Sequence, residues 1–238
     1  MRSFWMKVLA LACALAVAPA FAADTLTFTT EESPPFNMTV SGKVSGVATE
    51  AVEEMAKRAG VTIKISMLPW ERAYDMAQKE ANTCVYSTTR TPPREALFKW
   101  VGPLVANKWV LYAKADAKPV AKIEDVKAAK IGGYRGDAIA NFLKDGGYKV
   151  EETTNDAQNP EKLVAGRIDY WATSEAVGGT LVKEKKITGI KVILTFKEAQ
   201  MYLACGKGVA DATIKQLNDA LSAMTKDGTL EKMTKKYL

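Results

Sequence analysis

Histidine is absent from the 238 residues of the sequence. Its absence excludes Ser-His-Asp and Cys-His catalysis, and it excludes histidine-ligated metal sites. Glutamate and aspartate are present as candidate acids, but no acid/base pair is recognisable among them. We therefore expect a protein that is not an enzyme and that carries no metal or other cofactor.

Long hydrophobic runs are also scarce. The one run, from Val8 to Ala20, is shorter than the ~20 apolar residues of a membrane-spanning helix, so a membrane anchor is the weaker interpretation. Arg2 and Lys7 flank its start, and the small-residue pattern Ala20-Phe21-Ala22 ends it. A charged start, a short apolar run and a small-residue cleavage site are typical of a secretory signal. We predict that residues 1–22 are a cleaved signal peptide and that the mature chain is soluble outside the cytoplasm.

Neither sign of charge dominates. Lysine and arginine number 33 against 27 aspartates and glutamates, and losing Arg2 and Lys7 with the signal peptide lowers the formal net charge from +6 to +4. The basic residues are scattered along the chain and form no stripe. A nucleic-acid partner is therefore not expected.

Cysteine is rare. Cys13 lies in the predicted signal peptide, which leaves Cys84 and Cys205. Both lie in strand-like runs, and an oxidising compartment permits them to pair. Two unpaired buried thiols are the open alternative.

Strand-like and helix-like segments alternate along the mature chain. In the first half, apolar periodicity and turn residues predict strands near 26–30, 61–65, 83–87 and 109–112 and helices at 49–59 and 70–77. The second half predicts strands at 131–134, 168–171, 191–195 and 201–205 and helices at 137–144, 175–185, 211–226 and 229–237. This alternation predicts an α/β fold with mainly parallel sheets flanked by helices. It leaves open whether two units follow one another or one is inserted into the other.

Several motifs, in order, carry a resemblance to a known family. The stretch from Ser87 to Pro103 is similar to an S/T-rich, T-P-x-R, then aromatic-x-x-Pro signature. Further matches are Ser33-Pro34-Pro35-Phe36, Gly46 to Gly60, Leu68-Pro69-Trp70, Gly132 to Gly136 and Ala165-Gly166-Arg167-Ile168-Asp169. Together they resemble the family 3 extracellular solute-binding proteins, which supply polar amino acids and related solutes to ABC importers.

The resemblance implies the two-lobed fold of type II periplasmic binding proteins. Lobe 1 would comprise residues 23–112 plus 200–238, and lobe 2 would be the inserted segment 113–199, with two crossing hinge segments. A ligand in the cleft would favour the closed state, in which both lobes contact it. The implied partners are a small-molecule ligand and the inner-membrane permease of an ABC importer. The resemblance also implies that the protein is a monomer and that it is located in the periplasm.

The resemblance also assigns site residues in lobe 1. Arg94 aligns with the arginine that binds the ligand carboxylate, for which a planar guanidinium is suited. Ser87 and Thr89 match small hydroxyl positions, and Trp70 matches an aromatic pocket position. Arg72 could also reach the cleft.

In lobe 2, Gly136, Asp137 and Ala138 match a loop whose backbone N–H groups open a helix toward the ligand carboxylate, and Tyr134 lies in that loop. The sequence departs from the family pattern at two positions. Ser174, with Glu175 beside it, replaces the acidic residue for a ligand α-amine, and Ser33 replaces a tyrosine. The counter-charge for an amine is therefore open: Glu175, Glu31 or Glu32.

Two other functions remain possible on the same fold. One is an enzyme similar to a dehydratase of small carboxylated substrates, for which the sequence offers no recognisable acid/base pair. The other is a sensor that presents its closed form to a signalling receptor.

Overall fold

The structure is a computed structural model of the chain, and it describes residues 25–238. The predicted signal peptide, residues 1–22, lies outside the described residues. Within residues 25–238, no helix is both long enough and apolar enough to cross a membrane.

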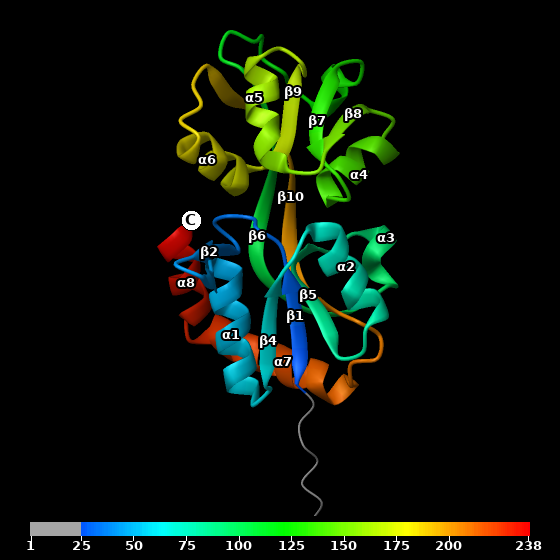
Figure 1. Cartoon of the computed structure of the whole chain (residues 1–238), viewed down its shortest axis with the longest axis vertical. Coiled ribbons are helices and arrows are strands. Elements are labelled where there is room, and N and C mark those ends of the chain that lie inside the picture. The colour runs from blue at the N-terminus through cyan, green and yellow to red at the C-terminus, as the bar shows by residue number, and fades with distance from the viewer. Residues whose placement is uncertain (1–24) are drawn as a thin grey trace, which may run out of the picture.

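Two groups of elements form two lobes joined by two long strands (Figure 1). The first lobe is built on the parallel strands β4, β1 and β5. Its elements are β1 (Leu26–Thr30), β2 (Met38–Val40), β3 (Lys43–Ser45), α1 (Val47–Ala59), β4 (Ile63–Met67), α2 (Trp70–Lys79), β5 (Thr83–Thr89), α3 (Pro92–Glu95), α7 (Asp211–Lys226) and α8 (Thr229–Tyr237).

The second lobe is built on the parallel strands β9, β7 and β8. Its elements are η1 (Ile123–Val126), β7 (Lys130–Tyr134), α4 (Ala138–Asp145), β8 (Lys149–Thr153), η2 (Asp156–Gln158), α5 (Asn159–Val164), β9 (Tyr170–Ser174) and α6 (Glu175–Glu184). The two-lobed α/β architecture expected from the sequence is thus confirmed.

Strands β6 (Lys99–Lys114) and β10 (Ile190–Cys205) connect the lobes. They pair antiparallel along their whole length and join both halves into one eight-stranded sheet of order β4-β1-β5-β10-β6-β9-β7-β8. The predicted lobe boundaries, at residues 112–113 and 199–200, fall inside these strands, where no break in regular structure marks them. Those boundaries stay a prediction.

The sequence predicted two separate strands, 191–195 and 201–205, where the structure has the single strand β10. The polar stretch Lys197-Glu198-Ala199-Gln200 interrupts the apolar alternation on which the prediction was based. In the structure, backbone pairing with β6 carries the strand through this stretch without a register shift; the three shifts in this pairing lie before and after it. The prediction of two strands was wrong because it relied on alternating apolar side chains. Hydrogen bonds between backbone groups can continue a strand where that alternation stops.

The α1 helix shows how local sequence sets the elements around the cleft. Gly46 precedes it with φ +115°, and a Cβ there would lie 2.4 Å from the carbonyl oxygen of Phe36, so only glycine fits. Gly60 ends the helix in the left-handed conformation. The close approach at Gly46 fixes the turn at residues 33–37 against the start of α1.

Cys84 of β5 and Cys205 of β10 lie side by side in the antiparallel pairing of these strands. The structure joins them by a disulfide bond. Both are fully buried in the core of the first lobe. The bond therefore ties the N-terminal part of the first lobe to the segment that returns from the second.

Candidate functional site

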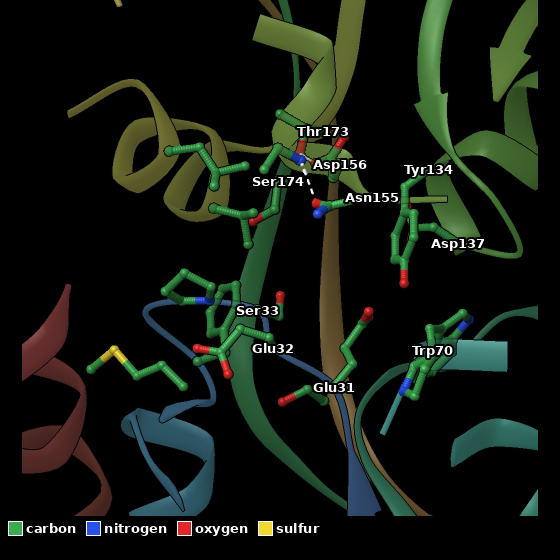
Figure 2. A pocket seen from close by; sticks show the side chains of 18 of the residues that line it. Glu31, Glu32, Ser33, Trp70, Tyr134, Asp137, Asn155, Asp156, Thr173 and Ser174 are labelled. Carbon is green, nitrogen blue, oxygen red and sulfur yellow. Dashed lines mark hydrogen bonds between the residues drawn. The ribbon is translucent and has the colours of Figure 1, made fainter. Parts of the chain in front are cut away.

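A cavity of about 700 Å³ lies between the lobes, and residues of both line it. The first lobe contributes the segment after β1, the start of α2 and the end of β5. The second lobe contributes the loop after β7, the segment after β8 and the end of β9. Figure 2 shows Glu31, Glu32, Ser33 and Trp70 facing Tyr134, Asp137, Asp156 and Ser174 across this space. Most of these segments follow the carboxyl end of a strand, where open α/β sheets bind ligands.

Most of the predicted residues of the first lobe line this cavity. They are Ser33, Trp70, Ser87, Thr89 and Arg94. The Ser87 hydroxyl donates to the side-chain oxygen of Asn37. Ser87 therefore holds the turn at residues 33–37 as well as lining the cavity.

Arg94 is buried and held from several sides. Its guanidinium carbon lies 5.4 Å from the ring centroid of Trp70 and 5.0 Å from that of Tyr74, at distances typical of cation–π contacts. Its Nη1 donates to the Thr89 carbonyl at 3.3 Å, and its Nη2 donates to the Gly136 carbonyl at 3.1 Å. Two of the five guanidinium donors thus bond to backbone carbonyls of the protein, one in each lobe.

The Gly136 carbonyl is one point at which the two lobes are bonded to each other beside the cavity. Besides Arg94, Trp70 of the first lobe donates to it through Nε1, at 3.0 Å. Asn141 of α4 donates to the same oxygen at 3.4 Å. Gly136 has φ +72°, a conformation suited to glycine. Two first-lobe side chains therefore converge on one acceptor of the second lobe.

The start of α4, where the resemblance implied an anion site, is capped by a carboxylate of the protein itself, and the implied anion site stays a prediction. Asp137 is the N-cap, and its carboxylate accepts from the backbone N–H of Ile139 at 3.0 Å. The side chain of Asp137 also lines the cavity. A carboxylate of the protein therefore already occupies the helix N-terminus, which disfavours a ligand carboxylate at the same place.

Three carboxyl groups near the cavity have perturbed acidity. Burial raises the pKa of Glu31 to about 8, even though a hydrogen bond from Tyr134 and the charge of Arg94 oppose the rise. Burial also raises the pKa of Asp156 to about 6 and that of Asp137 above its ordinary value. In each case the desolvation of the charged form exceeds the stabilisation by its neighbours.

Asp156 was missed by the sequence analysis. Its carboxylate accepts from Trp171 Nε1 and Asn159 Nδ2 at 2.8 Å each and from Thr173 Oγ1 at 2.7 Å. It also lines the cavity, together with Asn155. The available signal was its position directly after the strand that ends at Thr153, at the ligand-binding edge of the sheet.

Four predicted residues do not line this cavity: Arg72, Glu175, Gly136 and Ala138, of which the last two line a second cavity described below. Arg72 is exposed on α2, because a helix turns by about 100° per residue and directs it away from the side on which Trp70 lies. Glu175 is exposed at the start of α6, and its carboxylate lies 3.9 Å from Lys108 Nζ. Ser174, the residue before it, is buried and does line the cavity.

A second cavity, of about 560 Å³, lies on the other side of Trp70, Arg94 and Gly136. Gly136 and Ala138 line this cavity and not the first. Its other lining residues include Tyr74, Trp109, Phe142 and Lys197. The contacts to the Gly136 carbonyl thus form part of the wall between two spaces at the lobe interface.

Residues 26–238 match the profile of the family described as bacterial extracellular solute-binding proteins, family 3. Among curated relatives, the L-cystine-binding protein TcyJ of Escherichia coli (strain K12) is 25% identical over 209 residues, which are 86% of this chain and 78% of that protein. A probable histidine-binding protein of Neisseria gonorrhoeae is 26% identical over 215 residues, 87% of this chain and 80% of that protein.

Solved structures share the architecture. An ancestral arginine-binding protein bound to arginine superposes with a TM-score of 0.79 at 26% identity, over 90% of this chain and 98% of that one. A histidine kinase sensor domain with similarity to periplasmic binding proteins gives 0.84 at 20% identity, over 90% and 96%. The second likeness concerns the fold alone.

Proposed function

Because the chain belongs to the family 3 bacterial extracellular solute-binding proteins, we propose that it captures a small carboxylate-bearing solute by lobe closure and delivers it to an ABC importer. The solute would be an amino acid or a related compound. The cystine-, histidine- and arginine-binding relatives support this class by their names. The proposed place of action is the periplasm, where the protein would work as a monomer with the importer's permease.

The cavity between the lobes is the observation that carries the proposal. Its volume of about 700 Å³ lies in the range of small-molecule sites, roughly 300–1,000 Å³. Its lining comes from both lobes, so a bound solute gains contacts from each of them only when the lobes are closed. Trp70 and Arg94 bond to Gly136 in the same closed arrangement. A solute and these contacts therefore favour the same state.

Arg94 is the proposed partner of the ligand carboxylate. It is the only lysine or arginine among the described residues that line this cavity. The rings of Trp70 and Tyr74 and the Thr89 carbonyl hold its guanidinium in place. A donor group held in place before binding loses less conformational entropy when the ligand arrives.

A thermal-shift screen of the mature protein against amino acids, amines and organic acids tests solute binding. A solute present at about 100 times its Kd stabilises the protein by about 2.7 kcal/mol. Arg94→Ala should lose most of this stabilisation for carboxylate-bearing solutes. Arg90→Ala is the matched control, because Arg90 also lies over two rings, at 5.5 Å from Trp100 and Tyr202, but lines neither cavity.

Equal stabilisation of wild type and Arg94→Ala by the best solute would refute the role of Arg94. A screen in which no solute stabilises the wild-type protein would refute solute capture itself. Delivery is tested separately, by uptake of the radiolabelled solute in cells with and without the gene. Unchanged uptake in the deletion strain would contradict a transport role.

A further inference from the structure

The carboxylates around the cavity between the lobes point to the charge of its ligand. We propose that this cavity selects solutes of net positive charge, an inference that rests on the proposed function. The cationic nitrogen of the solute would be buried between Glu31 of the first lobe and Asp137 and Asp156 of the second. Glu31 is then the residue that determines specificity. The inference narrows the ligand from small carboxylate-bearing solutes in general to those with more positive than negative groups.

The charges of the lining residues are strongly unbalanced. The carboxylates that line the cavity belong to Glu31, Glu32, Asp137, Asp156 and Glu184, whereas Arg94 is the one basic residue of the described lining. Arg94 lies close enough to Asp137 and Glu31 to oppose the rise in the pKa of both, but it does not outweigh their burial. One guanidinium cannot neutralise this set of acids.

Of the three acids proposed to surround the cation, Glu31 has the fewest hydrogen-bond partners: one, against two for Asp137 and three for Asp156. It is partly buried, at the end of β1, and Figure 2 shows its carboxyl group directed toward the Tyr134 hydroxyl across the cavity. The charged groups that face it are Asp137 and Asp156, which raise its pKa, and Arg94, which lowers it. A cation of the ligand would add the favourable charge that the described residues do not supply.

Unpartnered polar atoms in the cavity wall, one of them the acceptor Asn107 Oδ1, point independently to a ligand that forms hydrogen bonds. Asn107 and Ser174 line the cavity and are each only 6% exposed. Asn107 Oδ1 and Ser174 Oγ have no hydrogen-bond partner among residues 25–238. Buried polar atoms are nearly always bonded in proteins, and an ammonium, amidinium or guanidinium group supplies several donors at once.

The geometry favours an organic cation over a metal ion. Across residues 25–238, no three Asp, Glu, Cys or His side chains converge closely enough to hold a metal. The acids instead lie on opposite walls of a cavity of about 700 Å³, which has room for a molecule the size of an amino acid or a diamine. A cation would stabilise the ionised form of Glu31 in place of the proton that burial favours, whereas a neutral solute of the same shape would supply no such charge.

Matched solutes that differ in one charge test the inference by calorimetry. L-Arginine has a cationic guanidinium group where L-citrulline has a neutral ureido group, and L-lysine has an ammonium group where 6-hydroxy-L-norleucine has a neutral hydroxyl group. We expect the more positive member of whichever pair binds to bind about thirtyfold more tightly, as for one partner of a buried charge pair. L-Glutamine and L-glutamate complete the panel as neutral and anionic solutes.

Glu31→Gln keeps the shape of the side chain and should reduce the preference within the pair to about threefold or less. Glu53→Gln makes the same change on α1, outside both cavities, and should keep the full preference. If a neutral or anionic solute binds best, or if Glu31→Gln keeps the full preference, the inference is wrong while solute capture stands. If no solute of this panel or of the wider screen binds, solute capture is itself refuted, and the inference with it.

Discussion

Trp70→Phe tests whether the contacts to Gly136 control lobe closure. Trp70 Nε1 donates to the Gly136 carbonyl at 3.0 Å across the cleft, so opening the lobes breaks this bond. Phenylalanine keeps a ring at the same place but has no donor. The substitution therefore removes a hydrogen bond from the closed state alone.

The expected magnitude follows from the partners that remain. The Gly136 carbonyl keeps its bond from Arg94, at 3.1 Å, so no buried acceptor is left without a partner. The loss is then the net contribution of one hydrogen bond, about 1 kcal/mol. That free energy lowers the closed population, and with it the affinity for the solute, by about fivefold.

Isothermal calorimetry with the best solute of the screen measures the affinity, and small-angle scattering of the unliganded protein measures closure. Trp100→Phe is the matched control. Trp100 Nε1 donates at 3.2 Å to the Glu95 carbonyl, which belongs to the same lobe. If Trp70→Phe changed the affinity by less than about twofold, or if Trp100→Phe weakened it as much, the reasoning about the cleft contact would be refuted.

Three further predictions concern stability. Replacing Cys84 and Cys205 together by serine should destabilise the protein by about 5 kcal/mol in urea unfolding, since the bond closes a loop with a sequence separation of 121; a loss below about 1 kcal/mol would contradict this. Gly46→Ala should cost about 1–3 kcal/mol in the same assay, because of its φ of +115° and the close approach to Phe36; unchanged stability would show that the turn adapts. The pKa of Glu31 in the folded state, about 8, exceeds its ordinary value of 4.5, so between these pH values the folded state binds a proton that the unfolded state does not. The free energy of unfolding therefore falls as pH rises through this range, by at most about 1.4 kcal/mol per pH unit. Between pH 6.5 and 8 no histidine titrates in this chain, and the thermal midpoint of Glu31→Gln should fall less than that of wild type; parallel curves would exclude Glu31 as the source.

Much of the fold follows from local patterns. The helix predicted at 49–59 is α1, Val47–Ala59, and the helix predicted at 211–226 is α7 with those same bounds. Each has one apolar face, and each ends where glycine or a turn stops it. Prediction was poorer for β10, because its middle is polar and is held by backbone pairing with β6.

The candidate site was predictable only in part. The motif around Arg94 indicated the first-lobe wall of the cavity, since those residues lie close together in the chain. The sequence also predicted Arg72 and Glu175 as site residues, from their positions near Trp70 and beside Ser174. A step of one or two residues along a helix changes the direction in which a side chain points, however. The structure places both Arg72 and Glu175 outside the cavity.

By itself the sequence determined the class of fold, the order of its elements and the family, because periodicity and short motifs record local burial and local turns. It also excluded histidine chemistry outright. Only the tertiary structure decided that Glu31, Asp137 and Asp156 meet around one cavity and that Trp70 and Arg94 share the Gly136 carbonyl. These residues come from distant parts of the chain, and their distances depend on strand order and on lobe closure, for which a local pattern gives no signal.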